Sequence, residues 1–532
     1  MAGRRTVPGF LGLLGMLLLS WLNAAQAQAA GPTERLTVLM ASSPSSLDPH
    51  RAYTGSDFQI MGHLYDSLAE RDLFHPAPGL LSEWQSQDQL LWRLRLTQGR
   101  RFADGSPVQA RDIAYSLCRW AALNRGNTGL PLSLRRAGVA GDGEVVLELA
   151  RPFTRMISAF FLIYGVKAPA AFTDASCTPD MPVGLLMLYS PPMGSGPYRI
   201  AGVDSGREYR LAAVPPVNGR TAAPFEEVLL RVETESQARV RALADGQADI
   251  IEDPPPAPMA YLPGLPHISL TELPTDRTLF LSLNLSGDSP GNPLARGSPA
   301  LMDTRVRRAL TLAINKPLLA QRATDGYGAA ANQLGSPGMR GFASDRAQDS
   351  YDPAAARSLL RAAGFEAGLT LELLTAPSRG SDGGRTADVL AGMLSAVGIK
   401  VNVHRVGREE FRERVRDGRF DMALNLIGIE DGIVLSAYEA MLRPVPMRTI
   451  MNPGQYQDAE ITRLLAAAET DPAAIDTAVT GIQAVLDRDT PFIPLLHMRD
   501  LVLHRADLIV APRDTGRVFG RAVTPRDGAP VR

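Results

Sequence analysis

An alternation of strand-like and helix-like segments in the second half of the chain constrains its fold more than any other sequence feature. Apolar runs typical of strands span 369–374, 399–406 and 420–427, and segments with helical periodicity at 385–396 and 408–416 separate them. Strands joined through helices pair in parallel, because each helix returns the chain to the same end of the sheet. This half is therefore predicted to form an α/β layer.

Periodicity and turn residues predict further elements outside this region. Predicted strands are 35–41, 90–96, 144–149, 198–203, 208–214, 226–232 and 248–251, with short strands over 492–497. Predicted helices are 55–68, 110–123, 236–244, 303–314, 459–469 and 473–488, and one that starts at Asp352-Pro353 and ends at Gly364. A Pro- and Gly-rich stretch at 191–197 breaks the first half.

The N-terminal 29 residues have the three-part pattern of a secretory signal peptide. Arg4 and Arg5 precede an uncharged apolar run from Phe10 to Leu22, and small residues follow at 25–29. A retained anchor helix is the alternative, but this run is shorter than the roughly 20 residues that span a bilayer. We expect cleavage between Ala27 and Ala29. Cleavage after Ala29 leaves 503 of the 532 residues and, by removing two cations and no acid, changes the formal charge from −1 to −3.

The charge balance and the cysteine count bear on whether the protein binds nucleic acid or a metal. Lys and Arg total 55 against 56 Asp and Glu, so no basic excess indicates nucleic-acid binding. Export to an oxidising compartment would allow Cys118 and Cys177 to form a disulfide, and two buried thiols are the alternative. Two cysteines cannot build a zinc cluster, and the seven histidines match no standard metal-site spacing. We therefore expect no metal and no other cofactor.

Known catalytic motifs are missing from the sequence. It contains no H-E-x-x-H, no G-x-S-x-G and no G-x-x-x-x-G-K-[ST] motif. Because catalytic triads are recognised by geometry, missing motifs lower the expectation of an enzyme without excluding one. We expect a protein that is not an enzyme and has no catalytic residues.

Several segments resemble one family, in order and rough spacing, through nearly the whole chain after residue 29. They include SLDPHRAY at 46–53, HLYDSLAERD at 63–72 and GSGPYRI at 194–200, and the longest is 79–119. Others are 238–251, 303–319, 351–365 and 489–497. Together they are similar to the periplasmic solute-binding proteins of peptide-type ABC importers, extracellular solute-binding family 5, which includes dipeptide, oligopeptide and nickel binders.

This resemblance implies an α/β fold of the two-lobed periplasmic-binding-protein type (type II), closing about a hinge, with an extra subdomain on the first lobe. Mapped onto this chain, the parts after the signal peptide (1–29) are a first lobe of 30–76, 192–284 and 490–532, an extra subdomain of 77–191, and a second lobe of 285–489. Closure about the hinge would bury a ligand between the lobes.

The resemblance also implies which residues bind the ligand. The family's acid that holds the ligand's α-ammonium corresponds best to Glu430, with Asp431 beside it, since a buried ammonium needs an opposite charge. Cleft hydrogen bonds are expected from the loop after the first strand, from Ser42, Ser43, Ser45 and Ser46. Peptide binders typically carry Trp before the acid and Pro after it. This chain has Leu426-Ile427-Gly428 and Gly432-Ile433 in those places.

The expected function is that of a monomeric periplasmic receptor, not embedded in the membrane after signal cleavage. It would capture a peptide or peptide-sized small molecule and deliver it to an inner-membrane ABC permease. A nickel chelate, an opine or glutathione is an alternative ligand, and a sensor or chaperone role is an alternative use. A periplasmic hydrolase on this scaffold is a third possibility, which no nucleophile–base pair in the sequence supports.

Overall fold

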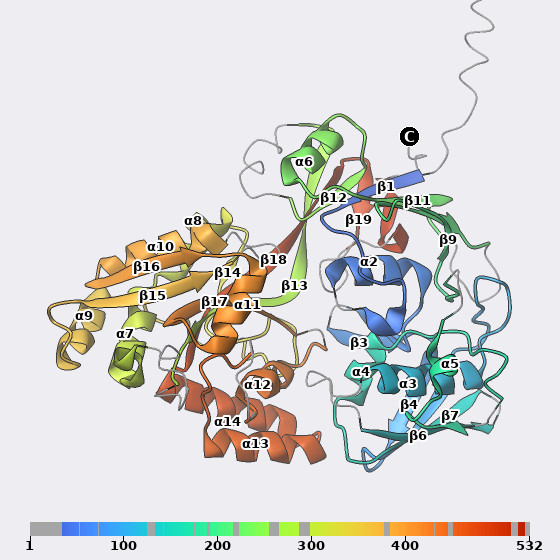
Figure 1. Cartoon of the computed structure of the whole chain (residues 1–532), viewed down its shortest axis with the longest axis horizontal. Coiled ribbons are helices and arrows are strands. Elements are labelled where there is room, and N and C mark those ends of the chain that lie inside the picture. Colours follow the sequence, from blue (N-terminus) through green and yellow to red (C-terminus); the bar gives the residue numbers. More distant parts are fainter. Residues whose placement is uncertain are drawn as a thin grey trace, which may run out of the picture.

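The computed structural model shows two lobes side by side, joined at one end by long strands, with a smaller body beneath the first lobe (Figure 1). The structure describes residues 35–52, 54–72, 74–124, 133–141, 143–173, 176–188, 192–215, 223–254, 265–286, 298–376, 383–429, 431–444, 451–511 and 520–526. In these ranges no helix combines the length and apolar character needed to cross a membrane.

One sheet of eleven strands runs through both lobes. Its order is β16-β15-β17-β13-β18-β12-β1-β11-β10-β9, and the short β14 pairs with β18 beside this path. The strands are β1 (Arg35–Met40), β9 (Tyr198–Asp204), β10 (Glu208–Ala213), β11 (Glu227–Val232), β12 (Ile250–Glu252), β13 (Ile268–Leu283), β14 (Ala329–Ala330), β15 (Leu369–Thr375), β16 (Ile399–Arg405), β17 (Met422–Gly428) and β18 (Phe492–Arg505).

Two strands, β13 and β18, are long enough to belong to both lobes. They pair antiparallel from Ile268 opposite Arg505 to Ser282 opposite Phe492. At the first-lobe end β18 pairs with β12, and at the second-lobe end β13 pairs with β17. The register shifts between Pro274 and Thr278, where proline has no amide hydrogen to give to the ladder. This shift interrupts the regular ladder of the ribbon that connects the two lobes.

The second lobe confirms the predicted strand–helix alternation. β15 pairs in parallel with both β16 and β17, and α10 and α11 provide the connections. Its helices are α7 (Thr304–Ala313), α8 (Lys316–Thr324), α9 (Pro353–Ala362), α10 (Gly383–Ser395), α11 (Arg408–Asp417), α12 (Val434–Leu442), α13 (Ala459–Thr470) and α14 (Ala474–Asp489). Helix α7 starts where Asp303 accepts a hydrogen bond from the Arg305 amide, and its buried face includes Val306 and Leu310.

The first lobe contains α2 (Gly55–Leu64), α6 (Ser236–Ala244) and the short hairpin of β2 (Ala69–Asp72) and β3 (His75–Pro78). A two-stranded sheet of β19 (Leu508–Val510) and β20 (Val523–Pro525) lies near its edge. Among the described residues, short 3-10 helices span Pro49–Arg51, Pro299–Met302 and Gly520–Ala522. The predicted helix at 55–68 is wrong at its end. It stops at Leu64 because Tyr65 is extended, with ψ of 148°.

The smaller body, which we call the extra subdomain, is built on an antiparallel sheet of order β4-β5-β7-β6-β8. Its elements are β4 (Leu81–Ser86), β5 (Leu91–Leu96), α3 (Ala110–Leu123), β6 (Leu134–Gly141), β7 (Glu144–Leu149), α4 (Met156–Leu162), β8 (Ser176–Cys177) and α5 (Val183–Leu186). Cys118 on α3 and Cys177 on β8 form a disulfide.

A buried ion pair fastens the extra subdomain to the first lobe. Arg119 on α3 is fully buried and binds both carboxylate oxygens of Asp48, at 2.8 and 2.5 Å. Next to it, the His50 ring lies 2.8 Å from the Tyr164 carbonyl oxygen. The SLDPH segment noticed in the sequence thus holds these two bodies together.

Candidate functional site

The loop after β1 is fixed to the start of α2 by one buried carboxylate. Asp57 accepts hydrogen bonds from the Ser45 amide (2.5 Å) and the Ser45 hydroxyl (2.8 Å), and from the Ser46 amide (3.3 Å). It also accepts from the Thr54 amide (2.8 Å), which closes a capping box on α2. The structure therefore gives Ser45 a partner inside the first lobe.

Ser42 and Ser43 are exposed, as Ser45 is, and their hydroxyls bond to other partners. The Ser42 hydroxyl lies 2.7 Å from the Ser56 hydroxyl, and the Ser43 hydroxyl donates to the Gly206 carbonyl oxygen at 3.1 Å. Both bonds are at the surface, where exchange with water is easy. These two hydroxyls can turn towards a ligand at low energetic cost.

The segment after β17, residues 429–433, was predicted to carry the acid that binds the ligand. It follows the strand that pairs with β13, and the Ile429 amide donates to the Asp276 carbonyl oxygen at 3.0 Å. Asp276 lies within the register shift of β13, so this segment begins beside that irregular part of the ribbon. Glu430 lies outside the described residues.

Asp431 binds an arginine of the extra subdomain. Its Oδ2 accepts from Arg155 Nη1 at 3.1 Å and from the Ser436 hydroxyl, and its Oδ1 accepts from the Ile433 amide at 3.1 Å. Arg155 Nη2 also binds Glu439. Arg155, Asp431 and Glu439 are all buried, and we refer to them as the interlobe ion cluster. Both carboxylate oxygens of Asp431 are therefore engaged by groups of the protein itself.

The interlobe ion cluster contains more negative than positive charge. One guanidinium faces two carboxylates, and Arg443 approaches Glu439 only at 3.8 Å while it pairs with Glu469 at 2.6 Å. Burial raises the pKa of the Glu439 carboxyl above its ordinary value, although Arg155 and Arg443 favour its ionised form. The extra subdomain thus supplies the cation that makes burial of two acids in the second lobe tolerable.

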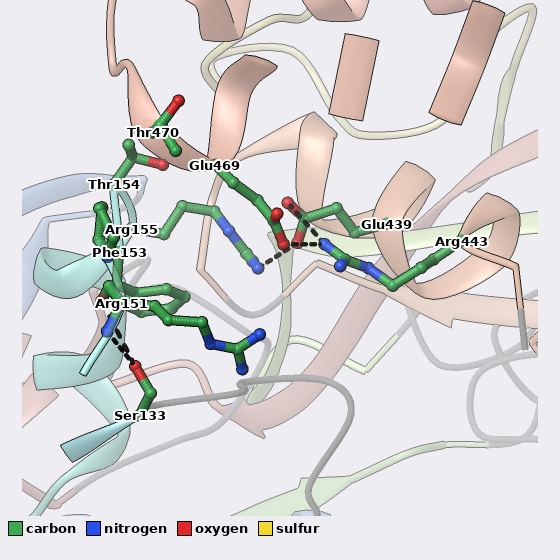
Figure 2. A pocket seen from close by; sticks show the side chains of 10 residues that line it. Ser133, Arg151, Phe153, Thr154, Arg155, Glu439, Arg443, Glu469 and Thr470 are labelled. Carbon is green, nitrogen blue, oxygen red and sulfur yellow. Dashed lines mark hydrogen bonds and ion pairs between the residues drawn. The ribbon is translucent and has the colours of Figure 1, made fainter. Parts of the chain in front are cut away.

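A small cavity of about 150 Å³ lies beside this cluster, between the extra subdomain and the second lobe. In Figure 2, Arg155 reaches from one wall and Arg443 from the opposite wall towards Glu439 and Glu469 between them. The Arg151 side chain also lies at this cavity. Its volume is below the roughly 300–1,000 Å³ of typical ligand pockets, so it is a gap in an interface rather than the main ligand site.

A phenylalanine makes the apolar part of the same contact. Phe74, at the tip of the β2–β3 hairpin, packs against the hydrophobic core of the second lobe. It lies over two glycines with positive φ, Gly338 (96°) and Gly432 (71°). A Cβ at Gly432 would lie 3.2 Å from the Phe74 carbonyl oxygen, so the close approach needs glycine there.

Sequence reasoning missed Arg155, Glu439 and Phe74. Arg155 had no distinguishing feature, because its partner Asp431 is 276 positions away. Glu439 did have one, since it is the single charged residue in VLSAYEAML, the apolar sequence of α12. An isolated acid in such a helix indicates a buried partner.

In the described part of the chain no three His, Cys, Asp or Glu side chains converge as a metal site requires. The buried histidines are used inside the fold instead. His63 accepts a hydrogen bond from the Gly520 amide at 2.8 Å, and His497 packs against the Phe342 ring.

Comparisons with known proteins agree with this architecture. Residues 75–444 match the family described as bacterial extracellular solute-binding proteins, family 5 Middle. The dipeptide-binding protein of Escherichia coli (strain K12) is 23% identical over 431 residues, which cover 76% of this chain and 77% of the relative. The glutathione-binding protein GsiB of Escherichia coli O1:K1 / APEC is 24% identical over 525 residues, covering 95% of this chain and 97% of the relative.

Among solved structures, the periplasmic binding protein DppA from Helicobacter pylori in complex with the peptide STSA superimposes with a TM-score of 0.72. It is 19% identical, and the match covers 93% of this chain and 98% of the other. The predicted two-lobed α/β fold is confirmed by this likeness and by the shared sheet that connects the lobes.

Proposed function

Because this chain belongs to the bacterial extracellular solute-binding proteins of family 5, we propose that it captures a peptide or peptide-sized solute between its lobes and delivers it to an inner-membrane ABC permease. It acts in the periplasm, as a monomer and without catalysing a reaction. The family match over residues 75–444 carries this proposal. The β13–β18 ribbon, shared by both lobes, supports it by offering a hinge.

Glu430 is the residue we propose for the ligand's ammonium group. Of the two acids in residues 429–433, Asp431 already binds Arg155, Ser436 and the Ile433 amide. That leaves Glu430, which directly follows Ile429, the residue whose amide donates to the Asp276 carbonyl oxygen within the register shift of β13. Ser42 and Ser43, with surface hydroxyls in the loop after β1, are proposed to face the same ligand from the first lobe.

The residues around Glu430 favour a ligand that differs from a standard peptide. Leu426-Ile427-Gly428 and Gly432-Ile433 stand where peptide binders typically have Trp and Pro. The relative matched along 95% of this chain is a glutathione-binding protein. Glutathione carries an α-ammonium group within a peptide-like chain, and we therefore put it beside di- and tripeptides as a second candidate ligand.

The test is a thermal-shift screen of the mature protein followed by calorimetric titration. Di- and tripeptides, glutathione, nickel–histidine chelates and opines are the probes, and a true ligand raises the melting temperature with its concentration. If every peptide and glutathione leaves the melting temperature unchanged, the proposed ligand class is wrong.

Glu430→Gln tests the ammonium assignment with the ligand found in that screen. Removal of one partner of a buried ion pair costs about 3–5 kcal/mol, so affinity should fall by at least about a hundredfold. The matched control is Glu409→Gln, a mainly exposed acid on α11 of the same lobe, which should bind normally. Unchanged affinity in the Glu430→Gln protein would remove this residue from the site.

A further inference from the structure

The extra subdomain touches the second lobe, although its ion pair with Asp48 attaches it to the first. Three side chains that lie close together in sequence make this contact. The Thr154 hydroxyl donates to the Ala468 carbonyl oxygen at 2.9 Å, and Arg155 enters the interlobe ion cluster. The Ser158 hydroxyl lies 3.4 Å from the Asp431 carbonyl oxygen. All three come from the start of α4 and the residues just before it. The contact is therefore made by one short element.

From this geometry we infer that Arg155 is a positioning residue that fastens the extra subdomain to the second lobe when the lobes close. The subdomain then takes part in closure and retention of the ligand. This inference rests on the proposed binding function, because it assumes that the two lobes open and close.

The chemistry of the interlobe ion cluster suits a contact that must form and break. A buried ion pair roughly balances the loss of hydration of its members against their mutual attraction, so its net contribution to stability is small. When the lobes separate, Arg155, Asp431 and Glu439 regain water. If one partner is missing, the closed state must instead bury an uncompensated charge, which is strongly unfavourable.

The Phe74 contact supplies the apolar attraction that the ion cluster lacks. Phe74 is only partly buried and packs on Gly338 and Gly432, so a single ring enters and leaves the second-lobe surface. Gly432 directly follows Asp431 in the chain. The ionic and apolar contacts therefore converge on residues 429–433, the segment that holds the proposed ligand acid.

A buried arginine with the same type of partner provides the matched control. Arg119 also comes from the extra subdomain and binds Asp48 through two hydrogen bonds, but Asp48 is in the first lobe. Loss of Arg119 should lower stability without changing the balance between open and closed lobes. Loss of Arg155 should change that balance.

The experiment measures the distance between lobes by pulsed electron spin resonance on ligand-free protein. Spin labels are placed at Ala140→Cys on β6 and Ser358→Cys on α9, two exposed positions on opposite sides of the interface. We expect Arg155→Gln to lower the ratio of short to long distances by at least about a hundredfold relative to the parent protein. Arg119→Gln should leave this ratio within about twofold.

Phe74→Ala is the second variant, in case Arg155→Gln does not fold, because it removes only a ring at a hairpin tip. It should also shift the population to longer distances, and Arg155→Lys should give an intermediate ratio because it keeps the charge without the forked geometry. The inference is wrong if folded Arg155→Gln leaves the distances unchanged, or if Arg119→Gln changes them equally; if Arg155→Gln does not fold, unchanged distances in both Arg155→Lys and Phe74→Ala would refute it. No ligand is present, so either result is independent of whether the proposed ligand class is correct.

Discussion

Acid should destabilise this protein through two buried histidines, and His50 gives the sharper test. Burial, and then the nearby Arg119 charge, lowers the pKa of His50 to about 3. Burial, with Lys316 and Arg499, lowers the pKa of His497 to about 4. Each ring is therefore neutral in the folded protein at a pH where the unfolded chain, with a histidine pKa of about 6.5, binds a proton.

The sign and size of the effect follow from these values. The stability contributed by the neutral rings is complete above about pH 6.5 and is lost as the pH falls towards 4 for His497 and towards 3 for His50. A pH of about 5 is about 1.5 units below the histidine pKa of the unfolded chain, so each histidine lowers the free energy of unfolding by about 2 kcal/mol at that pH. Together they remove about 4 kcal/mol from the free energy of unfolding, out of the 5–15 kcal/mol typical of a folded domain.

The assay compares denaturant unfolding at about pH 7 and about pH 5, followed by circular dichroism. His50→Gln lowers the stability at neutral pH, but the loss between the two pH values should be smaller than in the parent protein by about 2 kcal/mol. His267→Gln, at an exposed histidine, is the control and should keep the full loss. If His50→Gln loses as much stability as the parent protein, the burial argument is refuted.

Two further predictions concern stability. Replacing Cys118 and Cys177 together by Ala should lower the free energy of unfolding by about 4 kcal/mol, because the disulfide closes a loop with a sequence separation of 59 and so reduces the entropy of the unfolded chain. Denaturant unfolding without reductant measures this loss. Recovery of both cysteines as free thiols in non-reducing mass mapping of the parent protein would contradict the pairing. Gly432→Ala should cost about 1–2 kcal/mol because of its positive φ and the close Phe74 backbone, whereas Gly392→Ala, on α10 with open space around it, should stabilise by about 0.5–1 kcal/mol. A scanning calorimetry trace in which both glycine variants shift the melting temperature in the same direction would contradict this reasoning.

The sequence predicted those parts of the fold that depend on local periodicity. The parallel order of β15, β16 and β17 followed from the alternation at 369–427, and α3 and β7 begin and end where the pattern predicts. The strand structure predicted at 492–497 is confirmed from its first residue, but its predicted length is wrong, because one continuous strand, β18, runs on to Arg505. Charged residues interrupt its apolar pattern, and one of them, Asp500, is tolerated because Arg277 of β13 pairs with it.

The site was harder to predict from the sequence, because its contacts join residues that are far apart in the chain and leave no local periodicity. A carboxylate at 431 looks the same in sequence whether a ligand or an arginine neutralises it, and only the packing of α4 against the second lobe brings Arg155 there. Ser45 was expected in the cleft, but Asp57 engages both its amide and its hydroxyl. As ligand-binding residues, Glu430, Asp431, Ser42, Ser43 and Ser45 all stay predictions, to be decided by binding measurements.

The β13–β18 ribbon has a consequence for how the chain acquires its structure. Residues 492–505 complete the sheet on both sides of the hinge, and they follow in sequence every other strand of that sheet. A growing chain therefore cannot finish either lobe until this late segment has been made, whereas the sheet of the extra subdomain, with its strands within residues 81–177, can form earlier. Synthesis should thus yield one early folded unit and a long partly unfolded remainder that closes in a single late step.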